Sequence, residues 1–280
     1  KFVFNAQRKI ENIVPVVRND AHMLIEECMI MANVSAALML EKHQAPALFR
    51  VHDKPDADRL ASFIAYLGEI GVPHRITDDA APADFTDVVS KTRQRPDQEL
   101  IQTMLLRSMK QAIYDGDNVG HFGLALDAYA HFTSPIRRYP DLVVHRALKA
   151  LIGKGKNKQK VSGAKAYTTE EIEQLGEQCS MTERRADDAT RDVADWLKCE
   201  FMQDHVGDSF EGVVASVTGF GLFVRLTEYH IDGLVHITSL GDDYYHYDDV
   251  KQMLVGESGS RSFRLGDALR LAKLLNREPP

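Results

Sequence analysis

Two adjacent arginines within a short aromatic segment are the most informative chemical feature of the sequence. Arg137 and Arg138 follow Pro135 in the segment 129–142, which reads YAHFTSPIRRYPDL. The guanidinium group is a planar fork of N–H donors that suits phosphate oxygens. Aromatic rings offer faces on which bases stack. The residue types alone leave two interpretations open, a loop that binds phosphates and bases or a surface loop with solvated arginines.

Helices must position this segment, because apolar residues recur at helical spacing on both sides of it. Caps, prolines and glycines then set the expected limits. The sequence predicts helices from Asn19 or Asp20 to Pro46, and over 56–70, 97–114, 140–152 and 168–204, with Trp196 as a core anchor of the last. It also predicts strands within 2–13 and 49–52, a loop over 78–87, irregular structure over 120–141 and a flexible lysine-rich loop over 154–165.

The character of the sequence changes after Gly207. Short apolar segments such as 210–217 and 220–224 are punctuated by Gly212, Gly219 and Gly221, a pattern typical of strands and turns. We therefore predict a domain over 1–206 and a second one over 207–280.

The amino-acid composition excludes few classes of function. The net charge of −7 argues against general nucleic-acid binding, but a local basic track within an acidic surface remains compatible with RNA. Three widely spaced cysteines predict buried or inert thiols in a reducing cytosol, and hence a cytoplasmic protein. The most apolar stretch, 28–40, is interrupted by Asn33 and Ser35, so no membrane-spanning segment is expected.

The arginine segment resembles the signature of the ribonuclease II/R (RNB) family, Tyr-Ala-x-Phe/Trp-Thr-Ser-Pro-Ile-Arg-Arg/Lys-Tyr. Segments 24–33, 120–124, 183–185 and 191–197 resemble further parts of that family in the same order, so the resemblance covers almost the whole chain. It implies a processive exoribonuclease that hydrolyses RNA from the 3′ end and releases nucleoside 5′-monophosphates. Structured RNA is included among the substrates that the resemblance implies.

The resemblance also implies roles for individual residues. Arg137 matches the arginine that supports the scissile phosphate, where it would balance charge developing on the phosphoryl oxygens. Glu26 matches an acidic residue near the 3′-terminal nucleotide. Arg138 is expected to hold a neighbouring phosphate, and the aromatic residues Tyr129 and Phe132 are expected to contact RNA.

One departure concerns magnesium, the cofactor that the resemblance implies. The family holds this ion on a cluster of aspartates, and no Asp-x-x-x-x-x-Asp-x-Asp-Asp arrangement occurs in the chain. The aspartates of 187–195 alternate with arginines, a pattern that favours ion pairs along a helix over a metal site. We therefore predict no metal ligand here, and an inactive chain if it is taken alone.

The segment 212–237 resembles the OB-fold RNA-binding domain of a ribosomal protein. The resemblance places Phe220, Phe223 and His236 on the RNA-binding face, with Arg225 near a phosphate. The alternative for Phe223 is the barrel core, because a one-residue change of register reverses its face. Residues 268–280 read as a helical or disordered tail, so the last strand is expected to be missing and the barrel truncated.

The sequence therefore predicts an α+β chain, with the mostly helical second part of an RNB-type catalytic domain followed by a small OB-fold β-barrel. The expected partners are single-stranded RNA, RNA with a 3′ overhang and ribosome-associated quality-control factors, without a membrane. The main alternative is a non-catalytic RNA-binding protein that acts through the OB-fold and the basic loop. A purely structural helical protein would leave both motifs unexplained.

Overall fold

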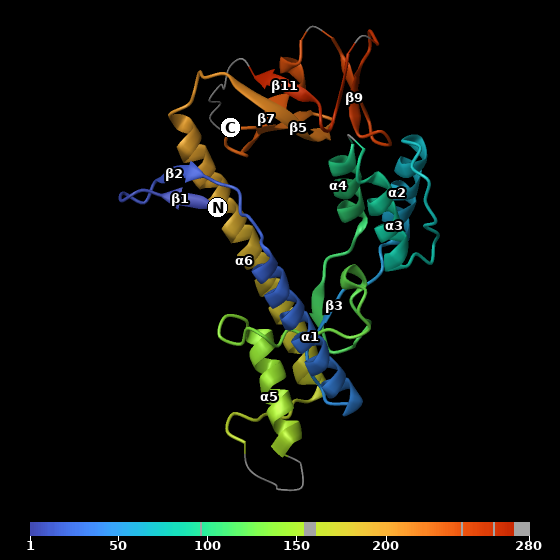
Figure 1. The fold of residues 1–280 in the computed structure, drawn as a ribbon, viewed down its shortest axis with the longest axis vertical. Helices are drawn as coiled ribbons and strands as arrows, with labels where there is room; N and C mark the ends of the chain where they lie inside the picture. The colour runs from blue at the N-terminus through green and yellow to red at the C-terminus, as the bar shows by residue number, and fades with distance from the viewer. Residues whose placement is uncertain (96, 154–160, 242, 260, 272–280) are drawn as a thin grey trace.

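The computed structural model describes residues 1–95, 97–153, 161–241, 243–259 and 261–271, which form a helical region and a β region (Figure 1). The helical region contains β1 (Phe2–Phe4), β2 (Ile10–Ile13), α1 (Asp20–Lys42), β3 (Phe49–Val51), α2 (Ala57–Glu69), α3 (Pro82–Thr92), α4 (Gln98–Ser108), β4 (Ile113–Asp115), η1 (Phe122–Leu124), α5 (Tyr139–Gly153) and α6 (Thr169–Gln203). The β region contains β5 (Phe210–Thr218), β6 (Gly221–Leu226), β7 (Asp232–His236), η2 (Ile237–Ser239), β8 (Tyr245–Asp248), β9 (Met253–Gly256), β10 (Ser262–Arg264) and β11 (Ala268–Leu271). The α+β prediction is confirmed.

The helical region has two hydrophobic cores. In the first, α1, α5 and α6 pack around the antiparallel pair β3–β4, with buried side chains such as Leu40, Val143 and Ile172. In the second, α2, α3 and α4 surround Phe63, Phe85 and other buried residues. The arginine segment leads directly into α5 and therefore belongs to the first core.

Two predictions in this region were wrong. Residues 82–87 begin a helix instead of continuing a loop, because Pro82 occupies its first turn and the Asp84 carboxylate accepts a hydrogen bond from the backbone N–H of Ala81. The helix predicted over 97–114 ends at Ser108. Its last residues form β4 instead, where Ile113 pairs with Val51. The expected extended segment near the start is a hairpin of β1 and β2.

Helix α1 is unusual in its surface. By length and composition it is apolar enough to cross a membrane, a property that it shares with core helices of soluble proteins. Here α1 packs on α5 and carries a buried, hydrogen-bonded asparagine, Asn33.

Two antiparallel sheets build the β region, in the orders β11-β5-β6-β7 and β10-β9-β8. They share one core, to which Leu222 and Val224 contribute from the first sheet and Leu254 from the second. The tail prediction was wrong for residues 268–271, because β11 pairs with β5 and supplies the strand that we expected to be missing. Residues 272–280 lie outside the described part. The boundary near Gly207 stays a prediction, between the end of α6 and the start of β5.

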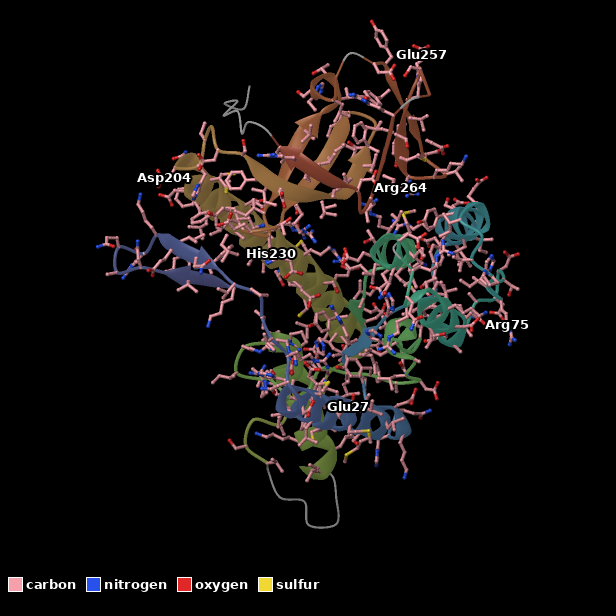
Figure 2. All side chains as sticks on the ribbon, turned by 45° about the horizontal axis from the view of Figure 1, so that its top comes forward. Glu27, Arg75, Asp204, His230, Glu257 and Arg264 are labelled. Carbon is pink, nitrogen blue, oxygen red and sulfur yellow. The ribbon has the colours of Figure 1, made fainter. Side chains whose placement is uncertain are left out.

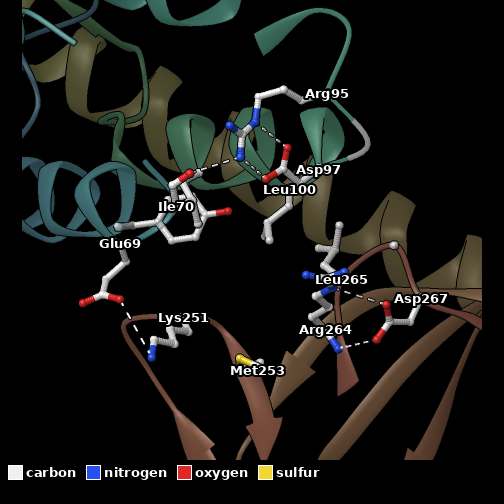
Figure 3. Close-up of a pocket in the computed structure, with 12 residues that line it drawn as sticks. Glu69, Ile70, Arg95, Asp97, Leu100, Lys251, Met253, Arg264, Leu265 and Asp267 are labelled. Carbon is white, nitrogen blue, oxygen red and sulfur yellow. Dashed lines mark hydrogen bonds and ion pairs between the residues drawn. The ribbon is translucent and has the colours of Figure 1, made fainter. Parts of the chain in front are cut away.

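The β region rests on α2 and α4. Leu265 packs against the second core of the helical region, and the Lys251 ammonium lies 3.8 Å from the Glu69 carboxylate. A cavity of about 400 Å³ remains between the two regions (Figure 3). Its charged residues are paired with one another, Arg95 with Asp97 and Arg264 with Asp267.

Candidate RNA-binding and catalytic site

The arginine segment makes a tight turn before α5. The Ser134 carbonyl accepts hydrogen bonds from the backbone N–H groups of Arg137 and Arg138. A fully buried carboxylate, Asp141, accepts a hydrogen bond from the Ser134 N–H at 2.7 Å. The Arg138 Nη2 atom also donates to its Oδ1 at 2.9 Å, and the Arg138 Nε lies 2.8 Å from Oδ2, which makes an ion pair without a second hydrogen bond. Arg138 is thus committed to a buried ion pair, and its predicted phosphate contact stays a prediction.

Arg137 differs from its neighbour in both exposure and partners. Its side chain is exposed and forms no hydrogen bond or ion pair with the residues that the structure describes. Ile136 beside it is 98% exposed. The turn therefore presents one unpaired guanidinium group outward and uses the other to hold its own backbone.

A buried side chain of α1 fixes the aromatic end of the segment. Asn33 is 2% exposed, and its Oδ1 accepts hydrogen bonds from the backbone N–H groups of Phe132 at 3.0 Å and Thr133 at 3.2 Å. Its Nδ2 donates to the Tyr129 hydroxyl at 2.9 Å. Tyr129 is itself 8% exposed, so its ring serves packing, and its predicted contact with RNA stays a prediction.

The half-buried Phe132 stacks on His145 of α5. The two ring centroids are 4.3 Å apart and the planes are nearly parallel, at 8°. The Nε2 atom of His145 also lies 2.9 Å from the Phe132 carbonyl oxygen. Phe132 therefore has one face covered by protein, and only the remainder of its ring is left for a base.

Glu26 lies elsewhere on α1 and is exposed. Its carboxylate forms an ion pair with Arg18, in the segment that leads into the helix. No described hydrogen bond or ion pair links Glu26 to Arg137, so the structure does not join the two predicted catalytic residues directly.

A charged cluster next to the segment was not identified from the sequence. Arg50 of β3 donates to Glu183 of α6 at 2.6 Å, and its guanidinium lies 4.5 Å from the centroid of the Tyr114 ring. The Tyr114 hydroxyl lies 2.8 Å from His131 Nδ1 and donates to Glu183 Oε1 at 3.3 Å. Burial, aided by nearby arginines such as Arg138, lowers the pKa of His131 to about 3. This histidine is therefore neutral at physiological pH.

The described residues do not fit a magnesium site, since no three histidine, cysteine or carboxylate side chains among them converge. The predicted ion pairs of α6 are confirmed in part. Asp188 lies 3.6 Å from Arg191, and Asp195 lies 2.8 Å from Lys198. Arg184 and Arg185, which we also expected to pair, have no ion pair within the described part of the chain.

The three predicted RNA-binding rings gather on the outer face of the first β sheet. Leu222 and Val224 of β6 point into the core, so Phe223 between them points outward. Phe220 is 51% exposed, and its ring centroid lies 6.1 Å from that of Phe223 in an edge-to-face contact. His236 is exposed at the end of β7, where it pairs with Gly221 beside these rings.

Arg225 shares this outer face but is already paired. Its guanidinium binds both carboxylate oxygens of Asp232 on the neighbouring strand, at 2.8 and 3.1 Å. The carboxylate neutralises the charge that we expected to meet a phosphate, so that role stays a prediction.

Comparisons with known proteins agree with this arrangement. The RNB domain model matches residues 1–154, more than half of the chain, and the S1 RNA binding domain model matches residues 203–270. Ribonuclease R of Vibrio cholerae is 61% identical over 98% of this chain, and ribonuclease R of Escherichia coli is 57% identical over 97%. Each of these matches spans 34% of the relative's own length.

Solved structures show the same fold. Mycoplasma genitalium RNase R in complex with ribose methylated single-stranded RNA superimposes with a TM-score of 0.84 at 27% identity, over 96% of this chain and 42% of the other. Yeast Ssd1, described as a pseudonuclease, superimposes with a TM-score of 0.68 at 25% identity, over 86% of this chain and 30% of the other. The chain, which spans about a third of the length of its curated relatives, belongs to the RNB domain family, and its similarity to ribonuclease R extends through an S1 domain.

Proposed function

We propose that the complete protein containing this chain is a processive 3′→5′ exoribonuclease that releases nucleoside 5′-monophosphates from single-stranded RNA and from structured RNA with a 3′ overhang. The observation that carries the proposal is the exposed, unpaired Arg137 on a turn held by buried Asn33 and Asp141. The relatives named ribonuclease R support the same reaction. We also propose the cytoplasm as its location, with ribosome-associated quality-control factors as partners.

In this proposal Arg137 binds the scissile phosphate. The turn fixes the backbone from which this guanidinium extends, and the guanidinium would balance the charge that develops on the phosphoryl oxygens. Arg138 and Asp141 hold the turn, while Phe132 and Glu26 contact the 3′-terminal nucleotides. Magnesium dependence is part of the proposal, but the described residues hold no suitable ligand cluster, so no step here runs through a metal.

The direct test of the reaction is product analysis. The complete protein is incubated with a uniformly labelled RNA that carries a 3′ overhang, with magnesium and with EDTA, and the products are separated by size and by terminal phosphate. We expect nucleoside 5′-monophosphates and no intermediate lengths when competitor RNA is added after the start. Internal cleavage products, or 3′-monophosphates, would contradict the proposed reaction.

The role of Arg137 is tested by Arg137→Ala, with Arg137→Lys as the charge-preserving variant. Loss of a donor that acts in the transition state costs about 10²–10³ in kcat, so we expect such a decrease with RNA affinity almost unchanged. The lysine variant should recover part of the rate, because it restores charge without the planar fork. A large loss of affinity with unchanged kcat would assign Arg137 to RNA binding instead.

Non-catalytic RNA binding is the second candidate. Two observations favour it for this chain: the described residues lack a metal cluster, and the same fold occurs in Ssd1, described as a pseudonuclease. If the complete protein binds RNA but releases no mononucleotides, this alternative is correct.

A further inference from the structure

Helix α4 of the helical region reaches the outer face of the first β sheet at Ser216 of β5. Ser216 of β5 pairs with Phe223 of β6, and residues paired across two strands present their side chains on the same face. The Arg107 guanidinium of α4 donates a hydrogen bond to the Ser216 hydroxyl at 3.1 Å. Arg107 therefore lies at the edge of the face that carries Phe223.

Two further observations agree with this placement of α4. Glu99, near the start of α4, and Arg225 of β6 line one hollow of about 570 Å³ between the helix and the sheet. Burial raises the pKa of Tyr247, and the positive charge of the nearby Arg107 opposes that rise. Because Tyr247 lies beside Gly219, Arg107 is near the β5–β6 turn that carries Phe220. Helix α4 thus follows the aromatic face from Arg225 to the turn.

Charge distinguishes the two arginines on this face. Asp232 neutralises Arg225 through two hydrogen bonds. Arg107 is exposed and donates to a neutral hydroxyl, and it forms no ion pair with the residues described here. It is therefore the better placed of the two to meet a phosphate.

Exposed aromatic rings beside an unpaired arginine suit a single strand of RNA. Bases stack on exposed rings such as Phe220 and Phe223, while the phosphates between them need a cation nearby. We propose that Arg107 of α4 binds a backbone phosphate of a single strand whose bases stack on Phe220 and Phe223. The RNA-binding surface of the S1 domain then continues onto the helical region. This inference rests on the proposed function only for the identity of the ligand as RNA.

The test is equilibrium binding of a fluorescein-labelled single-stranded oligo(A) to the complete protein in EDTA, which removes turnover from the measurement. Arg107→Gln should weaken binding roughly threefold to tenfold and should reduce the slope of log K against log salt by about 0.7, the value for one contact to a single strand. Arg107→Lys should keep the slope. The matched control is Arg75→Gln, an exposed arginine between α2 and α3 that should change neither quantity (Figure 2).

A second control separates RNA binding from domain docking. Ser216→Ala removes the partner of Arg107 but keeps its charge, so affinity and salt slope should stay at their original values. The inference fails if Arg107→Gln changes neither the RNA affinity nor the salt slope. It also fails if Ser216→Ala has the same effect as Arg107→Gln, because the contact would then serve only to hold the two regions together. A protein that binds RNA with these properties but releases no mononucleotides would refute the exonuclease and leave the Arg107 contact intact.

Discussion

Replacement of Asn33 by alanine should destabilise the protein, because it leaves buried hydrogen-bonding groups of the arginine turn without partners. The side chain makes three hydrogen bonds, one to the Tyr129 hydroxyl and two to the backbone N–H groups of Phe132 and Thr133. A buried donor left without a partner costs about 1–3 kcal/mol. Since the two backbone donors share one acceptor, we expect Asn33→Ala to cost about 2–4 kcal/mol in the free energy of unfolding.

Tyr129→Phe is the matched control, because it keeps the ring and the two backbone bonds and leaves one donor, Asn33 Nδ2, without its partner. That variant should cost about 1 kcal/mol. Urea unfolding of both variants then isolates the two bonds that hold the backbone at Phe132 and Thr133. In the complete protein, Asn33→Ala should lower kcat more than it weakens RNA binding, since it displaces the turn that carries Arg137. If Asn33→Ala is no more destabilising than Tyr129→Phe, the two backbone bonds contribute nothing and the reasoning is refuted.

Two further predictions concern stability. The folded pKa of His131, about 3, lies below its ordinary value of 6.5, so the unfolded chain binds the proton more readily. Stability is then complete above about pH 6.5 and falls, by at most about 1.4 kcal/mol per pH unit, as the pH drops toward 3. Urea unfolding at pH 7.5 and 5.0 should show a smaller decrease for His131→Gln, and an equal decrease would contradict the assignment. Gly176→Ala should destabilise by about 1–3 kcal/mol, because the new Cβ would lie 2.8 Å from the Tyr114 carbonyl oxygen. Gly68→Ala, at a helix position with open space around it, should instead be neutral or stabilise by up to about 1 kcal/mol, and thermal unfolding of the pair checks the opposite signs.

The elements that local sequence determines were predictable. Helix α6 has a capping box in which Thr168 accepts from the Glu171 N–H and Glu171 accepts from the Thr168 N–H, and its predicted start agrees with the structure. The sequence did not predict strand β11, because alanine, leucine and arginine, the residue types of 268–271, favour helices. Its partner, Phe210–Val213, lies more than 50 residues earlier. Likewise Ile113 continues the helical spacing of α4 but pairs with β3, so a tertiary contact overrides the local pattern.

Burial was the other property that the sequence did not determine. Trp196 was predicted as a core anchor but is 63% exposed, because the buried residues of α6 lie in its first half, from Ile172 to Ser180. Of the three cysteines predicted to be buried or inert, Cys179 is buried, whereas Cys28 and Cys199 are exposed. Residue type indicates what a side chain can do, but only the packed structure shows which surface it faces.

The difference between residue type and burial also explains why the adjacent residues Arg137 and Arg138 have different roles. Asp141 is fully buried, and a buried carboxylate without a partner would cost several kcal/mol. Arg138 is the partner of this carboxylate, so the two charges neutralise each other within the fold. Arg137 has no such partner and keeps its positive charge at the surface. Asn33, Asp141 and His145 anchor the turn from beneath, through hydrogen bonds to the backbone of Phe132, Thr133 and Ser134. If Arg137 acts on the scissile phosphate as proposed, these buried polar residues contribute by fixing the backbone from which its side chain extends.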